Sequence, residues 1–303
     1  MTISTADALK LHLLVFLFGF TGILGKLVSI PAIDMVLYRT LIAAVGVAVV
    51  ILYRQESFRV ARGDIFRLLI TGAVVGIHWL TFFLAARVSN VSVSLVGFAT
   101  ASLWTALLEP LVKRYPLRYI EVIFGFVVLA GLYIIFAFDS NYAVGLTLGV
   151  VSGFTCAIFS VVNSLMVKRI SSHAITLYEM IGAAILISGF IPCYAYFTGE
   201  HPGIPALPVG WDWLWILLLG GLCTVYAYSA AVELMKRISV FFFQLTLNLE
   251  PIYGIIMAML VFGDSERMDF NFYLGTFIIL CSVLIYPYIK RRFTTTPTST
   301  TRL

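Results

Sequence analysis

The sequence is poor in charge and holds no recognisable catalytic motif. Only 12% of its 303 residues are charged, against about 25% in a typical soluble domain. It has no HExxH pattern, no pair of cysteines spaced for metal binding and no nucleophile elbow. Its four cysteines lie within or at the end of apolar stretches, where small buried thiols are common. We therefore expect no enzyme activity, no cofactor and no metal site.

Two further absences concern nucleotides and nucleic acids. The stretch from Gly19 to Lys26 superficially resembles a phosphate-binding loop, but Phe20 stands where glycine is needed and Leu27 replaces serine or threonine. The net charge is +5, yet the basic residues form short clusters rather than a long stripe with interleaved aromatics. These features argue against ATP-driven work by this chain and against nucleic-acid binding.

Apolar residues are what the sequence has in excess. They make up 61% of the chain, and the mean hydropathy is +1.00. A soluble fold cannot hide so much apolar surface, whereas a lipid bilayer accepts it. Ten runs are long enough to cross the bilayer as helices: 11–28, 33–53, 65–86, 91–112, 119–137, 143–166, 174–197, 212–232, 240–262 and 270–289. None alternates as a β-barrel strand does, so we predict an all-α integral membrane protein with ten transmembrane helices.

Lysines and arginines are distributed unevenly between the loops that join these runs. Sixteen fall on one side of the predicted membrane, and only Lys26, Arg87 and Arg267 fall on the other. Cytoplasmic loops are enriched in basic residues. The bias therefore predicts a multi-pass protein of the cell (inner) membrane with both termini in the cytoplasm. The Thr/Pro/Ser-rich tail, residues 294–303, is predicted to be disordered.

The two halves of the chain resemble each other weakly but in the same order. The corresponding motifs are Gly19-Phe20-Thr21 with Gly153-Phe154-Thr155, Leu37-Tyr38-Arg39 with Leu177-Tyr178-Glu179, and Arg87-Val88-Ser89 with Arg237-Ile238-Ser239. Each half, residues 1–140 and 141–293, then holds five helices. Because five is odd, the second half must enter the membrane in the opposite orientation. Inverted repeats are typical of secondary transporters, whose halves rock around a site near the midplane.

Individual residues add to this pattern. They are Arg39 in the second run, the stretch Leu249–Tyr253 with its proline in the ninth, and Gly263-Asp264 at the end of the ninth. Together with the five-plus-five arrangement over about 11–289, they make the chain resemble the EamA-type permeases of the drug/metabolite transporter superfamily. The first half departs from the pattern, with Ala101 at the position that matches Pro251. The resemblance implies transport of small metabolites, often export of amino acids or related compounds.

Ionisable groups inside a membrane are costly and are therefore functional candidates. Glu250 lies near the middle of the ninth run beside Pro251, which lacks a backbone N–H and is expected to kink the helix. Glu250 either carries a coupling proton, pairs with a substrate amine, or is a structural carboxyl bonded to a neighbouring helix. Gln244 and Asn248 share one helix face with Pro251. They either line a central cavity or form interhelical hydrogen bonds.

Aromatic residues supply a second group of candidates. His78 and Trp79 lie in the third run and Trp104 in the fourth, and aromatic walls of this kind suit an amphipathic metabolite. His78 is either a proton relay or a histidine whose hydrogen bonds are locally satisfied. Tyr226 and Tyr228, in the eighth run, are weaker candidates of the same kind.

Arg39 and Glu179 occupy equivalent positions of the two repeats. Arg39 is predicted near the outer end of its helix and Glu179 near the inner end, so we do not expect them to pair. Arg39 either binds an anionic group or gates the site, or it extends to the outer interface. Asn163, in the sixth run, is interpreted as a helix-packing residue.

Glycines four residues apart predict close helix packing. They are Gly72 and Gly76 in the third run, and Gly145, Gly149 and Gly153 in the sixth. We interpret them as contacts within one molecule and expect a monomer, with a dimer as the alternative.

The sequence as a whole predicts a secondary transporter that moves a small molecule by alternating access, driven by a proton or substrate gradient. Two alternatives come from other classes. An intramembrane enzyme that modifies a lipid or an isoprenoid would need acidic or histidine residues clustered at a membrane boundary. A passive channel would need a continuous polar stripe along its helices.

Overall fold

The computed structural model describes residues 4–136, 142–199, 201–266 and 269–294, and these residues are helical or loop, with no strand. Arg267 and residues 295–303 of the tail lie outside the described residues. The elements in chain order are α1 (Thr5–Leu27), α2 (Ala32–Tyr53), α3 (Arg62–Val88), α4 (Val91–Phe98), α5 (Ala101–Lys113), α6 (Tyr119–Phe136), α7 (Ala143–Met166), α8 (Ser172–Thr198), α9 (Asp212–Leu217), the π-helix η2 (Leu218–Tyr228), α10 (Ser229–Leu234), α11 (Val240–Leu247), α12 (Glu250–Phe262), the 3₁₀ turn η3 (Gly263–Glu266) and α13 (Phe270–Thr294).

Eight helical segments are long and apolar enough to cross a membrane. They are α1, α2, α3, α4 with α5, α7, α8, α9 through α10, and α11 with α12. In the described residues, α6 and α13 carry shorter apolar stretches, Tyr119–Gly131 and Phe270–Ser282. The predicted all-helical membrane class is therefore confirmed. Eight of the ten predicted spans meet the length and hydropathy expected of a crossing helix.

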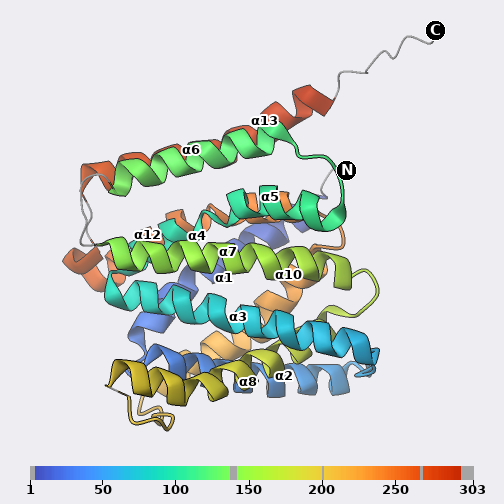
Figure 1. The fold of residues 1–303 in the computed structure, drawn as a ribbon, viewed down its shortest axis with the longest axis vertical. Helices are drawn as coiled ribbons and strands as arrows, with labels where there is room; N and C mark the ends of the chain where they lie inside the picture. The colour runs from blue at the N-terminus through green and yellow to red at the C-terminus, as the bar shows by residue number, and fades with distance from the viewer. Residues whose placement is uncertain (1–3, 137–141, 200, 267–268, 295–303) are drawn as a thin grey trace.

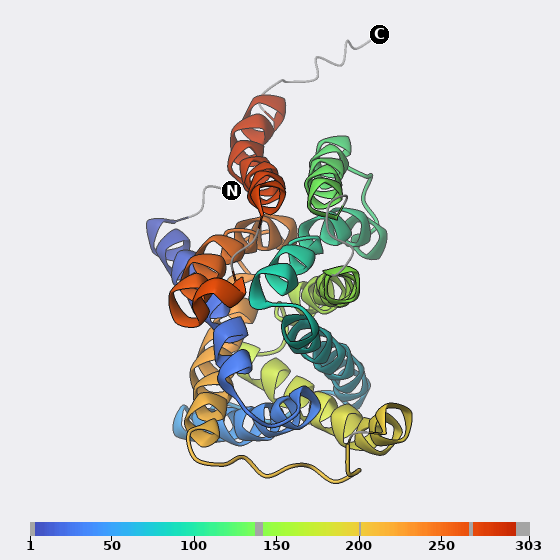
Figure 2. The ribbon, with the colours of Figure 1, turned by 90° about the vertical axis from the view of Figure 1, so that its left-hand side faces the viewer.

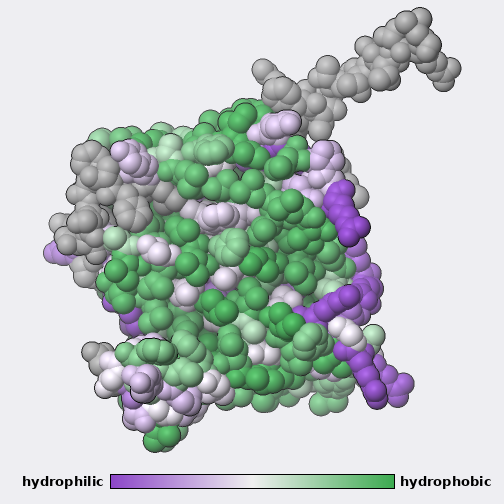
Figure 3. All heavy atoms as spheres, viewed as in Figure 1, coloured by the Kyte–Doolittle hydropathy of each residue, from purple (hydrophilic) through white to green (hydrophobic). Residues whose placement is uncertain are grey.

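The long helices lie side by side in one bundle (Figures 1 and 2). At one edge α6 and α13 pack against each other. In the rest of the bundle, α3 packs against α7 and α8, and α2 packs against α8 and η2. A broad hydrophobic surface covers the middle of the molecule (Figure 3), as expected for a protein whose outer face contacts lipid.

Hydrophilic side chains gather at one end of the bundle, where α1 begins and α13 ends (Figures 1 and 3). We call it the basic end, and it holds the loops 54–61, 114–118, 167–171 and 235–239. Ion pairs join these loops to neighbouring helices. Arg169 donates to Asp64 at 2.7 Å, and Arg237 lies 3.1 Å from Asp7 of α1.

Two of the crossing segments are broken near their middle. The α11–α12 segment breaks at Asn248 and Leu249, just before Pro251. There the missing N–H of proline costs little, because the first turn of a helix leaves its N–H groups unpaired anyway. The α4–α5 segment breaks at the equivalent place, before Ala101, without a proline. The ninth run is thus broken at the place where the sequence predicts a kink, and the α4–α5 break shows that proline is not required at this position of the fold.

The glycines of α7 and α3 lie against other helices of the same molecule. A Cβ atom on Gly149 would lie 3.0 Å from the Cα atom of Gly97 in α4. A Cβ atom on Gly72 would clash with the backbone of Glu179 in α8. Close packing within one chain, as predicted from the spacing, is confirmed at these two positions.

Candidate functional site

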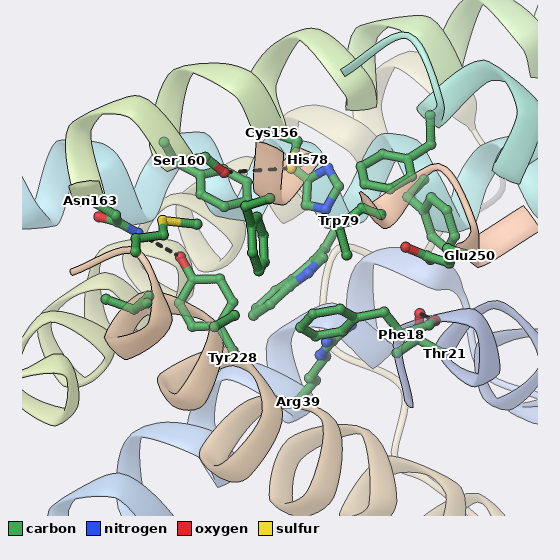
Figure 4. Close-up of a pocket in the computed structure, with 18 residues that line it drawn as sticks. Phe18, Thr21, Arg39, His78, Trp79, Cys156, Ser160, Asn163, Tyr228 and Glu250 are labelled. Carbon is green, nitrogen blue, oxygen red and sulfur yellow. Dashed lines mark hydrogen bonds between the residues drawn. The ribbon is translucent and has the colours of Figure 1, made fainter. Parts of the chain in front are cut away.

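A central cavity lies between the two halves of the chain (Figure 4). Its lining comes from α1, α2, α3, α4, α7 and from η2 through α12, with no described residue of α6 or α13. Measured as the space open to the centres of water molecules, it has a volume of about 60 Å³. A single water needs about 10–15 Å³ on this measure. The cavity therefore holds only a few waters, and a metabolite needs the helices to move apart.

Arg39 enters this cavity from α2. Its side chain is buried, at 2% exposure. The guanidinium lies over the ring of Trp79, 3.8 Å from the centroid, and its Nε donates to the hydroxyl of Thr224 in η2 at 3.0 Å. Of the alternatives considered for Arg39, extension to the membrane interface is therefore wrong. The negative face of the indole and the hydroxyl replace part of the water that the cation would otherwise need.

Glu250 enters the cavity from another helix, in the first turn of α12. It is 3% exposed and lines the cavity. Within the described part of the chain, its carboxyl makes no hydrogen bond and no ion pair. The cavity thus places one guanidinium and one carboxyl on its wall, separated by aromatic rings (Figure 4).

His78 and Trp79 line the same cavity from α3. His78 Nδ1 lies 2.8 Å from the hydroxyl and 3.0 Å from the carbonyl oxygen of Ser152. Its ring also packs against Phe98 and Phe159, with centroids 5.5 and 5.4 Å away. This is the geometry of a histidine whose Nδ1 is satisfied by a neighbouring helix.

Gln244 and Asn248 do not line the cavity. Gln244 donates to the hydroxyl of Ser160 in α7 at 2.7 Å, and Asn248 donates to that of Ser102 in α5 at 2.9 Å. Of the two roles considered for this polar face, the structure shows interhelical hydrogen bonding.

Trp104 and Tyr226 also lie outside the cavity. Trp104 packs edge to face against Phe154, with ring centroids 5.1 Å apart. Tyr226 is 45% exposed and lines a different, larger space that we call the basic-end hollow. This hollow measures about 620 Å³ on the same scale, and Glu56, His173 and Ser229 also border it.

Tyr228, rather than Tyr226, reaches the cavity. Its hydroxyl donates to Glu179 Oε2 in α8 at 2.8 Å. Asn163 Nδ2 in α7 donates to the same carboxylate oxygen at 3.3 Å and to the Tyr228 hydroxyl at 3.2 Å. Glu179 therefore bonds to these two residues and Arg39 to Thr224, in agreement with the expectation that the two do not pair.

The sequence contained only a weak signal for this group. Tyr226 and Tyr228 are two residues apart, so they lie on different faces of any helix, and spacing alone does not say which one points inward. Asn163 is polar and lies within an apolar run, but the sequence favours a helix-packing role for it.

Hydrogen bonds around the α1–α2 turn join helices at the end of the bundle opposite the basic end. Arg87 at the end of α3 donates to the carbonyl oxygens of Val28 and Ile30 at 3.1 and 2.6 Å. Asp212 at the start of α9 accepts from the N–H and the hydroxyl of Ser29 at 2.8 and 2.6 Å. These contacts tie both halves to one turn.

Comparison with known proteins agrees with this architecture. The sequence model of the EamA-like transporter family matches residues 8–137 and 143–286. The chain belongs to this family. It is therefore a multi-pass membrane protein with the fold of small-molecule transporters, and the family is one of transporters rather than enzymes.

The fold of this EamA-like transporter is shared with a solved crystal structure. The two chains are 15% identical and superpose with a TM-score of 0.70, over 95% of this chain and 99% of the other. At this identity the likeness shows the fold alone. No curated protein matches the chain significantly.

Proposed function

We propose that the chain is a secondary transporter that exports a small amphipathic metabolite, such as an amino acid or a related compound, across the cell (inner) membrane. The central cavity carries the proposal. It presents the Arg39 guanidinium and the Glu250 carboxyl among the aromatic rings of Trp79, Phe98 and Tyr228. Two ionisable groups on a wall that is otherwise largely aromatic suit a ligand that has both polar and apolar parts.

The proposed mechanism is alternating access by two inverted repeats, residues 1–140 and 141–293, with ten crossings in total. Helix contacts support it because they occur in related pairs. The third crossing, α3, packs on α7 and α8, while the eighth crossing, through η2, packs on α1 and α2. Likewise α4 and α5 pack on α7, while α11 and α12 pack on α1. Equivalent helices of the two halves thus pack on equivalent partners in the opposite half, as expected when a two-fold axis relates the repeats.

The proposed orientation places both termini in the cytoplasm. The basic end, where α1 begins and α13 ends, collects the loops rich in lysine and arginine, and such loops face the cytoplasm. The basic-end hollow then faces the cytoplasm, and the Arg87 and Asp212 contacts close the outer end. Because the cavity is lined within a single chain, we propose a monomer as the working unit.

The experiment that tests the function compares the medium of cells that overexpress the protein with the medium of empty-vector cells, by metabolomics. We expect at least one small compound to accumulate outside the overexpressing cells. Glu250→Gln removes the charge but keeps the size of the side chain, and we expect it to reduce that accumulation. Trp104→Phe serves as the control, because it changes a residue outside the cavity and should leave export near the unmodified level.

The proposal fails if no compound changes in the medium and the purified protein also transports nothing into liposomes. Equal export by the unmodified protein and by Glu250→Gln would be consistent with a transporter but would show that the Glu250 carboxylate does not take part in transport.

A further inference from the structure

A buried carboxyl and a buried amide beside the cavity are each left with an unpartnered oxygen. Glu179 in α8 and Asn163 in α7 are both 0% exposed. The carboxyl oxygen Oε2 accepts from Tyr228 and from Asn163 Nδ2. Its other oxygen, Oε1, and the amide oxygen Oδ1 of Asn163 have no hydrogen-bond partner. Buried polar atoms are nearly always paired, so two orphans in adjacent side chains need a cause.

The hydrogen-bonding chemistry of a carboxyl and an amide explains the two unpartnered oxygens. A carboxylic acid and a primary amide can form a ring of two hydrogen bonds, from the amide N–H to one acid oxygen and from the acid O–H to the amide oxygen. The first of these bonds is present, from Asn163 Nδ2 to Glu179 Oε2. The second bond would join the two unpartnered oxygens, Glu179 Oε1 and Asn163 Oδ1. Two bare acceptors cannot bond, but a proton on Glu179 Oε1 turns that oxygen into a donor.

The charges around Glu179 also favour its protonated state. The titratable side chain in contact with it is Tyr228, which donates to it. Arg39 of α2 and His78 of α3 border the cavity but hydrogen-bond to Thr224 and Ser152 instead. A buried carboxylate without a cation is costly inside a membrane protein, whereas a protonated carboxyl is not.

Side chains near Glu179 border each of the two spaces of the molecule. On the cavity side, its partners Asn163 and Tyr228 line the central cavity. On the other side, Thr176 lies one helical turn before Glu179 and accepts from the hydroxyl of Ser229 at 3.1 Å. Ser229 borders the basic-end hollow. The Thr176 hydroxyl itself donates to the carbonyl oxygen of Ser172 at 2.9 Å. It must therefore rotate toward Glu179 to pass on a proton that it accepts from Ser229.

We propose that Glu179 is the site that binds and releases the coupling proton of this transporter, with Asn163 and Tyr228 holding its carboxyl. The inference rests on the proposed function. A proton from water in the basic-end hollow forms an O–H bond at Oε1, and the same bond breaks when the proton leaves, with no change of oxidation state. A substrate that moves Asn163 or Tyr228 in the cavity changes the proton affinity of Glu179, and the linkage is reciprocal.

Infrared difference spectroscopy of the purified protein in lipid tests the site without a substrate. At neutral pH we expect a band of a protonated carboxyl that Glu179→Gln removes and Asn163→Leu shifts. Glu250→Gln serves as the matched control and should leave this band in place. A spectrum in which Glu179→Gln removes no such band overturns the proposal. If that variant does not fold, we expect Tyr228→Phe to shift the band. A band that Tyr228→Phe leaves unchanged also overturns the proposal.

Transport in liposomes tests the coupling, with the compound identified in the medium as the probe. We expect a pH gradient to drive accumulation by the unmodified protein. In Glu179→Gln, we expect the accumulation driven by the pH gradient to fall about fivefold or more. The variant should still exchange the compound across the membrane when the pH is equal on both sides. Undiminished accumulation by the variant, or accumulation driven by a sodium gradient instead, overturns the proposal. Failure of the unmodified protein to move any compound counts against the transport function, and the infrared result then still decides the protonation of Glu179.

Discussion

Arg39 shows how single residues keep a charge inside this bundle. Its planar guanidinium lies over the Trp79 ring, 3.8 Å from the centroid, while its Nε donates to Thr224 on another helix. Both contacts depend on the shape of the guanidinium and not only on its charge. Arg39 therefore has one fixed orientation at the cavity wall, which a flexible ammonium group would not have.

We expect Arg39→Lys to lower export of the identified compound by about tenfold, which corresponds to about 1.4 kcal/mol. The lysine keeps the charge but loses the Nε bond to Thr224 and the stacked contact with Trp79, a contact worth about 0.5–2 kcal/mol. Initial export rates, normalised to the amount of protein in the membrane, provide the measurement.

Trp79→Phe is the companion variant, because phenylalanine keeps an aromatic face with a weaker attraction for cations. We expect the export rate of Trp79→Phe to lie between the rate of the unmodified protein and that of Arg39→Lys. Export by Arg39→Lys at the unmodified rate would show that charge alone is sufficient at this position.

At the scale of elements, α3 and α8 pack closely against each other at glycines. A Cβ atom on Gly72 would meet the backbone of Glu179, and one on Gly182 would meet the backbone of Leu69. Backbone cannot move aside as the end of a flexible side chain can. The contact therefore fixes the depth at which Glu179 lies against α3.

We expect Gly72→Ala to lower the melting temperature of the purified protein, because the added methyl group forces the two helices apart at a cost of about 1–3 kcal/mol. Gly189→Ala is the matched control in α8, since a Cβ atom there meets no atom within 4 Å. Alanine favours helix more than glycine does, so the control should be unchanged or slightly stabilised. Thermal unfolding in detergent compares the two, and equal melting temperatures would show that the helices can adjust.

The elements also show what the sequence predicts and what it does not. Hydropathy places α2 and α7 within a residue of their observed bounds, since a helix that crosses lipid must be apolar along its whole length. The break before Ala101 carries no proline and has no local signal. The π-helix η2 is likewise invisible to a count of apolar residues, yet it positions Thr224 beside Arg39 and ends at Tyr228. Those features depend on packing between distant segments.

At the scale of the whole molecule, the two ends of the bundle differ. The basic end has a hollow of about 620 Å³. At the opposite end, the α1–α2 turn is bonded to Arg87 of the first half and Asp212 of the second. A transporter with alternating access must break one set of closing contacts when it opens to that side. In the proposed mechanism, release of the substrate requires Ser29 and Asp212 to separate.

A reversible cross-link between these two positions tests that requirement. Ser29→Cys and Asp212→Cys would be combined in a variant whose four native cysteines are replaced by alanine and whose export is first shown to persist. The two side chains are adjacent, with Ser29 Oγ 2.6 Å from Asp212 Oδ2, so a short thiol cross-linker can join them. We expect the cross-linked protein to export at the empty-vector level and to recover when the link is reduced, because the outer end can then open again. The two single-cysteine variants control for loss of the native bond and for modification of one thiol. Full export by the cross-linked protein would show that this end does not open during transport, and the substrate would then have to leave by another route.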